Sequence, residues 1–369
     1  MYKNLCIILN LAPHYRKAIY QAIDKEFECD WYAGDKIDDI KTLSNNELQR
    51  YKIVKNIFLI KHNYIQTAIL PLLFNKKYST YLVTGDIRNI TLWFFLLCSK
   101  LLRKKRVYLW THGDNGKGNI ITRAIKKCFF SLGDGIFLYG DYTKNHMVSA
   151  GYDEQKLFVI HNSLDYDTHL KCRRTLHTSD IYRHYFHNNN YNLIFIGRLT
   201  AVKRLDLILE AIYLLSQQGE EYNITFIGEG TEYNTLQKKV QQLQLQDKVW
   251  FYGACYDDDK TAELIYNADL CVSPGNVGLT AIHSMSFGTP IATHNNFTMQ
   301  MPEFEAIKEG KTGTYFKYND AASIAETIRV WFDHNGSKRE EIRTHCMQEI
   351  DVNWTPEYQI SVLKKHIVL

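Results

Sequence analysis

Short apolar runs alternate with segments of helical periodicity along the chain, and this alternation limits the fold more than any other feature of the sequence. Runs that predict buried strands lie at 5–9, 57–60, 81–84, 107–111, 136–139, 157–160, 193–196, 224–227, 249–252, 270–273 and 291–293. Between them the apolar positions follow helical spacing, as in the stripe Leu205, Ile208, Leu209, Ile212 and Leu215. Alternating strands and helices form parallel sheets with helices on both faces, so the sequence predicts an α/β fold.

Length and composition narrow the class of protein. The 369 residues suffice for two or three domains, and a content of 45% hydrophobic and 23% charged residues excludes a disordered chain. No apolar run approaches the roughly 20 residues that span a bilayer, and the run 5–9 lacks the length of a signal peptide. The eight cysteines form no Cys-x-x-Cys pair, which favours a reducing compartment over a zinc site or a disulfide framework. We therefore expect a cytoplasmic protein.

Positive charge is concentrated in the first half of the chain. Residues 1–180 contain 27 basic and 17 acidic side chains, whereas residues 181–369 contain 17 and 23. The basic side chains are densest from Lys100 to Lys127, directly after the apolar run 92–98. One interpretation is the solvated end of a core helix. The other is a patch that contacts an anionic membrane surface, from the inner face of the membrane, or a phosphate-bearing partner.

A polar stretch at 167–191 divides the chain, because it lacks apolar periodicity and contains three consecutive asparagines. The expected plan is a first α/β domain at 1–170, a linker region at 171–190, a second α/β domain at 191–350, and a segment at 351–369 that is a candidate for a helix crossing back to the first domain. Ligands of parallel sheets bind beyond the carboxyl ends of the strands. The active site is therefore expected in the cleft between the two domains.

The first candidate motif is the strand end at 194–204, Ile-Phe-Ile-Gly-Arg-Leu-Thr-Ala-Val-Lys-Arg. Gly197 lets the backbone approach a ligand closely. Arg198 and Lys203 suit a diphosphate, because arginine forks onto phosphate oxygens and lysine acts as a point charge. Taken alone, the motif is better explained by two solvated charges at a helix start.

The second candidate motif runs from Ser273 to Pro290. A strand ends at Ser273, a turn with glycine follows, and a helix of small and apolar residues begins near Gly278. The free backbone amides at such a helix start can bind an anion. The alternative is an ordinary strand, turn and helix in which glycine serves the geometry alone.

The third candidate is His112, which ends a strand and enters a polar loop with three glycines. A histidine at that position can contact a substrate, although a lone histidine can also be a satisfied structural residue. Weaker turn signals follow other strands at 162–165, 227–230 and 252–253.

The order of these motifs resembles the donor domain of GT-B-fold retaining glycosyltransferases of family 4, the glycosyl transferases group 1. The collinear elements are Gly-Arg-x4-Lys at 197–203, Ile-Gly-Glu-Gly at 227–230, Phe-Tyr-Gly at 251–253, Ala-Asp-Leu-Cys-Val-Ser-Pro at 268–274, Gly-Leu-Thr-Ala at 278–281, Phe-Gly-Thr-Pro at 287–290, Pro-Glu at 302–303 and Gly-Lys-Thr-Gly at 310–313. The first domain is similar only at His112-Gly113 and at 162–165.

The resemblance implies two Rossmann-like parallel-sheet domains facing a cleft, and a nucleoside-diphosphate sugar donor, UDP-linked in preference to GDP-linked, with no cofactor or metal. It implies that Arg198 and Lys203 hold the diphosphate and that His112 contacts the donor sugar near the anomeric carbon. The donor-binding candidates are Gly197, Glu229, Tyr252, Gly253, Asn276, Val277, Gly278, Leu279, Thr280 and His283. The acceptor-side candidates are His14, Arg16 and Asp114.

The chain departs from the family pattern at two places. The positions of the family's Glu-x7-Glu motif hold Gly275 and His283. In relatives the first glutamate contacts the donor sugar and the second contacts the ribose hydroxyls, so His283 is either a ribose ligand through a ring nitrogen or a packed helix residue. The segment 11–16, Leu-Ala-Pro-His-Tyr-Arg, stands where many relatives have a glycine-rich loop.

The leading hypothesis is a retaining, metal-independent glycosyltransferase whose acceptor is a saccharide or a lipid-linked saccharide in bacterial surface polysaccharide or glycolipid assembly. Two alternatives use the same fold: a non-catalytic nucleotide-sugar-binding protein and a nucleotide-sugar epimerase. Nucleic-acid binding is a poor match, because the basic excess lacks an interleaved aromatic platform.

Overall fold

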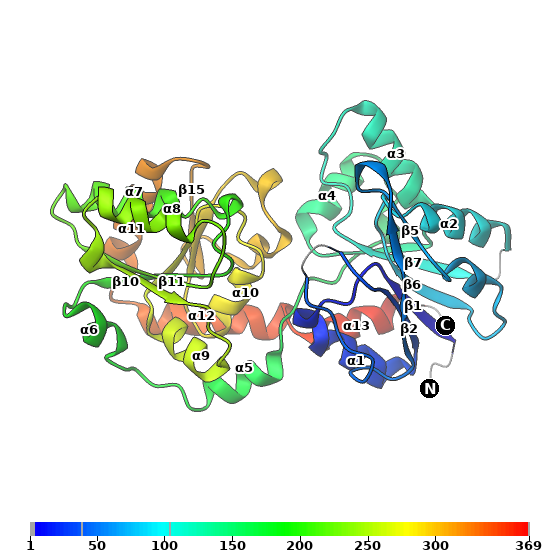
Figure 1. The fold of residues 1–369 in the computed structure, drawn as a ribbon, viewed down its shortest axis with the longest axis horizontal. Helices are drawn as coiled ribbons and strands as arrows, with labels where there is room; N and C mark the ends of the chain where they lie inside the picture. The colour runs from blue at the N-terminus through cyan, green and yellow to red at the C-terminus, as the bar shows by residue number, and fades with distance from the viewer. Residues whose placement is uncertain (1–3, 38–39, 103–104, 368–369) are drawn as a thin grey trace. The chain divides into compact units, whose positions relative to one another are not determined.

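The chain folds into two compact units, each built around one parallel sheet (Figure 1). The computed structural model describes residues 4–37, 40–102 and 105–367. The first unit comprises 1–165 and 355–369, and the second comprises 166–354. None of the helices in these described ranges is long and apolar enough to cross a bilayer. Two parts of the chain lie outside the described residues: Arg103-Lys104 of the basic segment, and Asp38-Asp39, an acidic pair that its sequence predicts to be a solvated turn.

The first unit contains a seven-stranded sheet in the order β3-β2-β1-β6-β7-β8-β9 with parallel neighbours. Its strands are β1 (Leu5–Leu9), β2 (Asp30–Gly34), β3 (Tyr51–Val54), β6 (Thr80–Thr84), β7 (Arg106–Thr111), β8 (Gly135–Leu138) and β9 (Leu157–Val159). Its helices are α1 (Lys17–Phe27), α2 (Ile90–Leu102), α3 (Ile120–Ser131), α4 (Asp141–Ser149) and α13 (Pro356–His366). The strand–helix alternation predicted from the sequence is confirmed.

Two apolar clusters cover the two faces of this sheet. One joins the sheet to α1 and to the C-terminal helix α13, with Tyr20, Phe27 and Leu363 among its buried members. The other joins the opposite side chains of the strands to α2, α3 and α4, with Phe95 and Phe129 fully buried. Because successive side chains of a strand point to opposite faces, each central strand supplies both clusters.

The run 57–60, predicted as a buried strand, is an exception. Only part of it is a strand, β4 (Asn56–Phe58), which pairs antiparallel with β5 (Tyr64–Gln66) outside the main sheet. Its side chains are exposed, with Ile60 at 83%. The prediction of a buried strand is wrong here, because an apolar run alone does not distinguish a core strand from an exposed hairpin.

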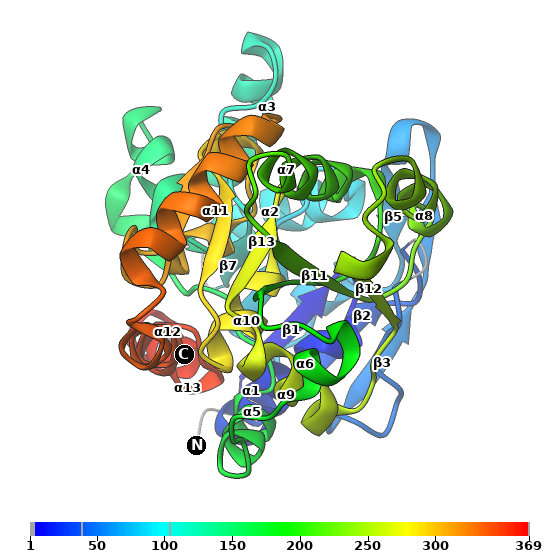
Figure 2. The ribbon, with the colours of Figure 1, turned by 90° about the vertical axis from the view of Figure 1, so that its left-hand side faces the viewer.

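The second unit contains a six-stranded parallel sheet in the order β12-β11-β10-β13-β14-β15. Its strands are β10 (Tyr191–Ile196), β11 (Tyr222–Ile227), β12 (Val249–Gly253), β13 (Leu270–Ser273), β14 (Ile291–His294) and β15 (Gly313–Phe316). Its α-helices are α5 (Tyr166–Arg173), α6 (Ile181–Phe186), α7 (Asp206–Ser216), α8 (Tyr233–Gln242), α9 (Asp258–Asn267), α10 (Leu279–Ser286), α11 (Ala321–Asn335) and α12 (Arg339–Asn353). Figure 2 shows α7, α8 and α11 on one side of the sheet and α9, α10 and α12 on the other.

The boundaries of the units differ from the expected plan. The segment 171–190, expected as a linker, contains the end of α5 and all of α6, and both helices pack on α9 inside the second unit. Its polar sequence lacks periodicity because the helices are short and bury few side chains, Tyr182 and Phe186 among them. The chain returns to the first unit at Thr355, and α13 packs on α1 there.

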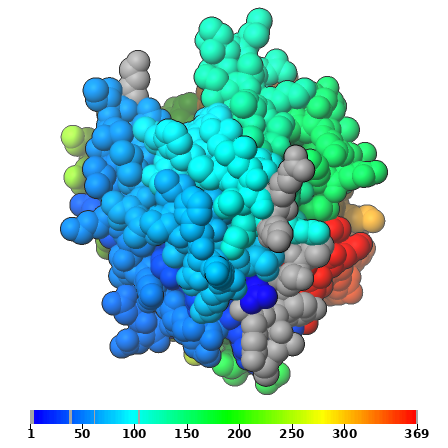
Figure 3. All heavy atoms as spheres, turned by 90° about the vertical axis from the view of Figure 1, so that its right-hand side faces the viewer, coloured from blue at the N-terminus to red at the C-terminus, as the bar shows by residue number. Residues whose placement is uncertain are grey.

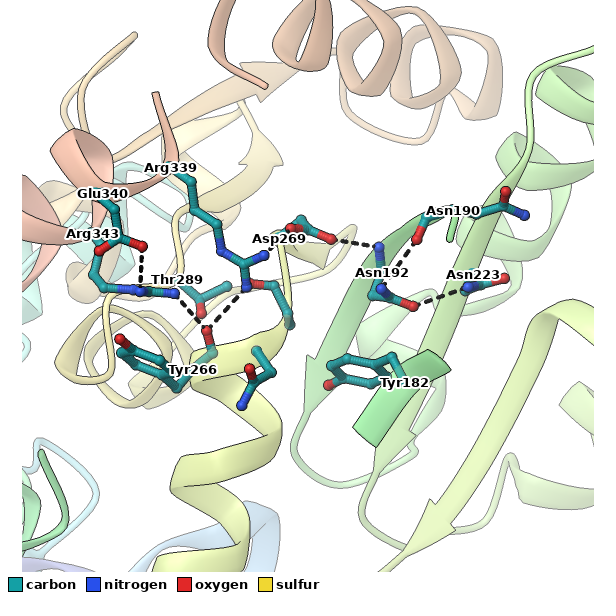
Figure 4. Close-up of polar contacts among 12 residues, drawn as sticks. Tyr182, Asn190, Asn192, Asn223, Tyr266, Asp269, Thr289, Arg339, Glu340 and Arg343 are labelled. Atoms are coloured by element: carbon teal, nitrogen blue, oxygen red, sulfur yellow. Dashed lines mark hydrogen bonds and ion pairs between the residues drawn. The ribbon is translucent and has the colours of Figure 1, made fainter. Parts of the chain in front are cut away.

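Charged side chains are paired at the amino ends of the strands in the second unit (Figure 4). Asp269 accepts the backbone N–H of Asn192 at 2.8 Å and forms an ion pair of 2.7 Å with Arg339. Arg343 lies over the ring of Tyr266, with 3.6 Å from its guanidinium carbon to the ring centroid. These pairs tie α12 to the starts of β10 and β13, so this end of the sheet is structural and leaves the carboxyl ends for ligands.

Candidate functional site

Two turns that contain glycine lie against each other at the carboxyl ends of the neighbouring strands β10 and β11. Gly197 has a φ of +146° and Gly228 a φ of +134°. A Cβ on Gly228 would lie 2.0 Å from the carbonyl oxygen of Gly197, and one on Gly230 would lie 2.2 Å from that of Leu199. Only glycine allows both this backbone conformation and such close contact between the two turns. The surface of the two turns therefore consists of backbone atoms without side chains.

Arg198 and Lys203 follow the first of these turns. Arg198 is exposed, whereas Lys203 is partly buried and donates from Nζ to the backbone oxygen of Asn276 at 2.6 Å and to its Oδ1 at 2.9 Å. Desolvation lowers the pKa of Lys203 to about 8, with Glu303 opposing the shift and Arg198 adding to it. The two cations follow the same glycine turn, and the charge of Arg198 contributes to the lowered pKa of Lys203, an arrangement that suits a diphosphate.

The turn before α10 lies against this lysine. Gly275 donates its N–H to the carbonyl of Lys203 at 2.9 Å, and Thr280 Oγ1 donates to the carbonyl of Ile196 at 2.8 Å. Gly278, with a φ of +55°, caps the helix, and Leu279 and Thr280 begin it. The first amides of a helix have no partner within it and carry its positive end. The backbone amides that the sequence predicts as an anion site therefore lie beside Lys203.

Gln300, which the sequence did not single out, and Glu303 of the Pro-Glu pair support this turn. Gln300 accepts the N–H of Val277 through Oε1 at 2.9 Å and donates to Thr293 and to the carbonyl of His294. Glu303, only 1% exposed, supplies the negative charge that keeps the pKa of Lys203 from falling further. Glu303 belongs to the short 3-10 helix 302–306, which packs on α10. The Pro-Glu pair at 302–303 was its only signal in the sequence.

His283 packs against a second histidine. Its ring stacks on that of His169 from α5, with 5.3 Å between centroids and 2° between planes, and Phe287 contacts both rings. Burial lowers the pKa of His283 to about 4, and burial followed by the charge of His283 lowers that of His169 to about 3. Both rings are therefore neutral at physiological pH, and this packing favours the helix-packing interpretation of His283.

Among the remaining donor-side candidates, Glu229 lies on the loop after β11, and Tyr252 and Gly253 are the last two residues of β12. Glu229 is exposed, and its carbonyl accepts the N–H of Leu199 at 2.9 Å. Tyr252 packs edge-on to Trp250, and the carbonyl of Gly253 accepts the N–H of Gly228 at 2.8 Å. The structure thus brings Gly197, Glu229 and Gly253 to the same end of the sheet as the two cations.

The first unit has its own cavity, of about 430 Å³, at the carboxyl ends of β1, β6 and β7. Arg16, Asp86, Arg88, Trp110, His112 and Tyr139 are among the residues that line it. His112 is exposed to solvent and packs on Tyr139 with 4.7 Å between ring centroids. The surrounding side chains, first by desolvation and then through the charge of Arg16, lower the pKa of His112, so its ring is neutral at physiological pH.

Two acceptor-side candidates lie outside this cavity lining. His14 is exposed and lies 3.9 Å from Glu47, while its neighbour Arg16 turns into the cavity. Asp114 is 2% exposed, pairs with Lys126 at 3.1 Å and accepts the N–H of Gly116, so it holds the glycine loop in place. Among the three expected residues, only Arg16 is in position to contact a ligand of this cavity.

Residues 180–346 match the family model described as Glycosyl transferases group 1. Mannosylfructose-phosphate synthase of Agrobacterium fabrum is 26% identical over 200 residues, which is 51% of this chain and 40% of that protein. The putative glycosyltransferase EpsD of Bacillus subtilis is 29% identical over 150 residues, 40% of this chain and 37% of that protein. The chain thus spans about two fifths of the length of these curated relatives.

Solved structures are similar over almost the whole chain. Alr3699/HepE of Anabaena in complex with UDP superposes with a TM-score of 0.72 at 12% identity, covering 98% of this chain and 99% of that one. The apo form of the lipopolysaccharide outer core galactosyltransferase WaaB gives 0.71 at 14% identity, covering 99% and 100%. The chain therefore has the GT-B fold expected from its sequence, and its residues 180–346 carry the signature of the glycosyl transferases group 1.

Proposed function

We propose that the chain is a glycosyltransferase that moves a sugar from a nucleoside diphosphate to an acceptor hydroxyl. The observation that carries the proposal is the grouping of Arg198, Lys203 and the start of α10 around bare glycine backbone at one end of the second sheet. The group 1 match over the same residues and the curated relatives with transferase names support it.

The proposed chemistry is stabilisation of a leaving diphosphate. When the glycosidic bond to the donor phosphate breaks, negative charge develops on the phosphate oxygens. The guanidinium of Arg198, the ammonium of Lys203 and the amides of Leu279 and Thr280 are preorganised donors for that charge. These groups can supply the positive charge that a divalent metal supplies in other transferases, so we propose metal independence, which assay in a chelator tests.

We assign the donor as a UDP-sugar in preference to a GDP-sugar, supported by the structural neighbours solved with UDP and with UDP-glucose. Retention of the anomeric configuration is part of the proposal because the motif order resembles that of retaining enzymes. We assign His112, which is neutral and exposed directly after β7, to contact with the donor sugar. Proton NMR of the first product formed from a donor of known anomeric configuration tests the stereochemistry.

A turnover assay decides between the proposal and its alternatives. A transferase releases nucleoside diphosphate and forms a glycoside, an epimerase forms a new nucleotide sugar, and a binding protein forms neither. The occupants of the two family glutamate positions, Gly275 and His283, are the observation that favours a binding protein. Release of UDP that depends on added acceptor supports the transferase, and binding without turnover over a broad acceptor panel contradicts it.

The acceptor is proposed to be a saccharide or lipid-linked saccharide at an anionic membrane surface. Ile120, Ile121 and Ile125 of α3 are 84%, 68% and 48% exposed, and Leu101 of α2 is 82% exposed. Exposed basic side chains, Arg123 among them, accompany these apolar ones. The two helices lie on the part of the first unit drawn in cyan and turquoise in Figure 3. Exposed apolar side chains beside cations are typical of membrane-surface helices.

A further inference from the structure

We propose that the cavity of the first unit binds an acceptor that carries an anionic group, a carboxylate or a phosphate, and that Arg16 and Trp110 bind this group. The inference rests on the proposed transferase function only in calling the ligand an acceptor. The binding site itself is argued from the side chains that line the cavity, and its test does not require turnover.

Arg16 lies in a box of aromatic rings. Its guanidinium carbon is 4.3 Å from the ring centroid of Trp110, 5.1 Å from that of Tyr139 and 5.5 Å from that of Tyr20. Its Nη1 donates to the hydroxyl of Tyr139. These contacts hold the guanidinium in one place, and a planar guanidinium can stack flat on an aromatic ring, which the ammonium of lysine cannot.

The guanidinium has spare hydrogen-bonding capacity and no paired carboxylate among the described residues. Its Nε and Nη2 atoms are buried and donate no hydrogen bond to any described residue. A guanidinium stays charged in a protein, and a buried charge is costly unless it is paired. An anionic ligand would supply both the missing charge and the missing acceptors.

Trp110 gives an independent sign of a ligand. The residue is 2% exposed and lines the same cavity, yet its indole N–H has no acceptor within the described ranges. Buried tryptophan N–H groups normally find a partner. A carboxylate or phosphate beside Arg16 has more than one oxygen and can accept from the indole and from the guanidinium together.

The other cations of the cavity already have partners. Arg88 forms two hydrogen bonds of 3.0 Å to Asp86, one to each carboxylate oxygen, and Lys126 pairs with Asp114. Arg16 is therefore the cation of this lining whose charge is not matched by a described carboxylate. Because His112 lines the same cavity, an anion held by Arg16 would place the rest of the acceptor close to His112.

The test compares three probes built on glucose: uncharged D-glucose, D-glucuronate with a carboxylate at C6, and D-glucose 1-phosphate with a phosphate at C1. Each is titrated into the full chain at constant ionic strength, with binding followed by calorimetry. The same titrations are followed on the indole N–H signals of the six tryptophans in ¹H–¹⁵N spectra, with the Trp110 signal assigned through Trp110→Phe. We expect at least one anionic probe to bind more tightly than glucose and to shift the Trp110 signal.

Variants at position 16 test whether Arg16 causes the tighter binding of the anionic probe. Arg16→Gln should weaken the anionic probe about 10- to 100-fold and leave glucose unchanged, as expected for the loss of charge-assisted hydrogen bonds. Arg16→Lys keeps the charge but loses the paired N–H donors of the guanidinium, so it should recover only part of the affinity. This variant replaces the glutamine variant if that one fails to fold. Arg106→Gln is the matched control, because Arg106 is exposed at the opposite end of β7 from Trp110. All titrations are repeated in Arg198→Ala to remove phosphate binding in the second unit.

Preference for glucuronate identifies a carboxylate acceptor, and preference for glucose 1-phosphate identifies a phosphate. Equal affinity for the three probes, or an anion preference that survives in Arg16→Gln, overturns the inference. UDP is titrated separately: failure of UDP to bind counts against the proposed function alone, because the cavity and the diphosphate turn lie on different units.

Discussion

Gly275 lies directly against the backbone of Lys203. Its N–H donates to the carbonyl of Lys203, and a Cβ at position 275 would lie 2.6 Å from the Cα of Lys203 and 2.1 Å from the carbonyl oxygen of Val202. Backbone atoms cannot give way as the end of a flexible side chain can. The loop that carries the proposed phosphate-binding lysine therefore occupies the space where a side chain at 275, such as the family's glutamate, would begin.

Gly275→Ala is accordingly expected to displace the loop 201–203 and to weaken UDP binding at least several-fold. Overpacking at such a contact also lowers the free energy of unfolding by about 1–3 kcal/mol. Gly219→Ala is the control, since Gly219 has a positive φ but no atom within 4 Å of its Cβ position. That control should lose some stability and keep its UDP affinity. Unchanged UDP affinity in folded Gly275→Ala would refute the packing argument.

The lowered pKa of Lys203 predicts a pH dependence of donor use. A lysine binds phosphate only when protonated, and the pKa of this one lies near 8 because it is desolvated. The kcat/KM for the donor, which reports the free enzyme, should therefore fall as the pH rises through about 8. Lys203→Arg should move this loss to much higher pH, because a guanidinium keeps its proton. The same inflection in both proteins would assign it to another group.

The stacked pair His169 and His283 predicts sensitivity to acid. Burial holds both rings neutral in the folded state, with pKa values of about 3 and 4, whereas an unfolded histidine titrates near 6.5. Between about pH 6.5 and 4 the unfolded chain binds more protons, so the free energy of unfolding falls as the pH falls. Each neutral histidine contributes up to about 1.4 kcal/mol per pH unit.

Urea unfolding at a series of pH values measures this slope. A His283→Phe variant should lower the slope and lose little stability at pH 7, since an aromatic ring still packs on His169. An unaltered slope would mean that His283 is not held neutral by the fold. The donor KM of the same variant then tests the second interpretation: a KM equal to that of the wild type excludes a ribose contact.

Membrane attachment is testable on α3. Binding to phosphatidylglycerol vesicles should be salt-sensitive and stronger than binding to phosphatidylcholine vesicles, because basic side chains near an anionic surface each contribute about 1 kcal/mol. Ile121→Glu should weaken it about tenfold or more, as expected when a large apolar side chain no longer enters the interface. Val352→Glu, at a 65% exposed position in the second unit, is the control. Equal binding of both variants would rule out α3 as the contact.

The fold could be predicted from the sequence in those segments where the apolar periodicity matches the burial of the side chains in the structure. The stripe that starts at Leu205, the N-cap of α7, continues along that helix to Leu215, and the run 270–273 is strand β13 with all four residues buried. Strands β2, β3 and β15 of the two main sheets were not predicted, because Asp30 in β2, Lys52 in β3 and Gly313 with Thr314 in β15 interrupt the apolar pattern. Tertiary pairing with neighbouring strands, rather than local propensity, makes these segments strands.

The site could be predicted only where a motif marked it. The glycine turns and the cations Arg198 and Lys203 are recognisable because their spacing is fixed by the strand end. The contacts of Gln300 with Val277 and of Arg16 with Trp110 join residues 23 and 94 positions apart, which no local pattern reveals. The same holds for His283, whose packing partner His169 belongs to a helix in the polar stretch.

Calorimetric titration of UDP into the wild-type chain, Arg198→Ala and Lys203→Ala tests the central claim most directly. Arg329→Gln, at a surface ion pair of α11 away from the turn, is the matched control. We predict that UDP binds the wild type and the control alike, and that each of the other two variants loses about 10- to 100-fold in affinity while its melting temperature without ligand changes little. Absence of UDP and GDP binding to the wild type, or equal affinity in all four proteins, would contradict the account.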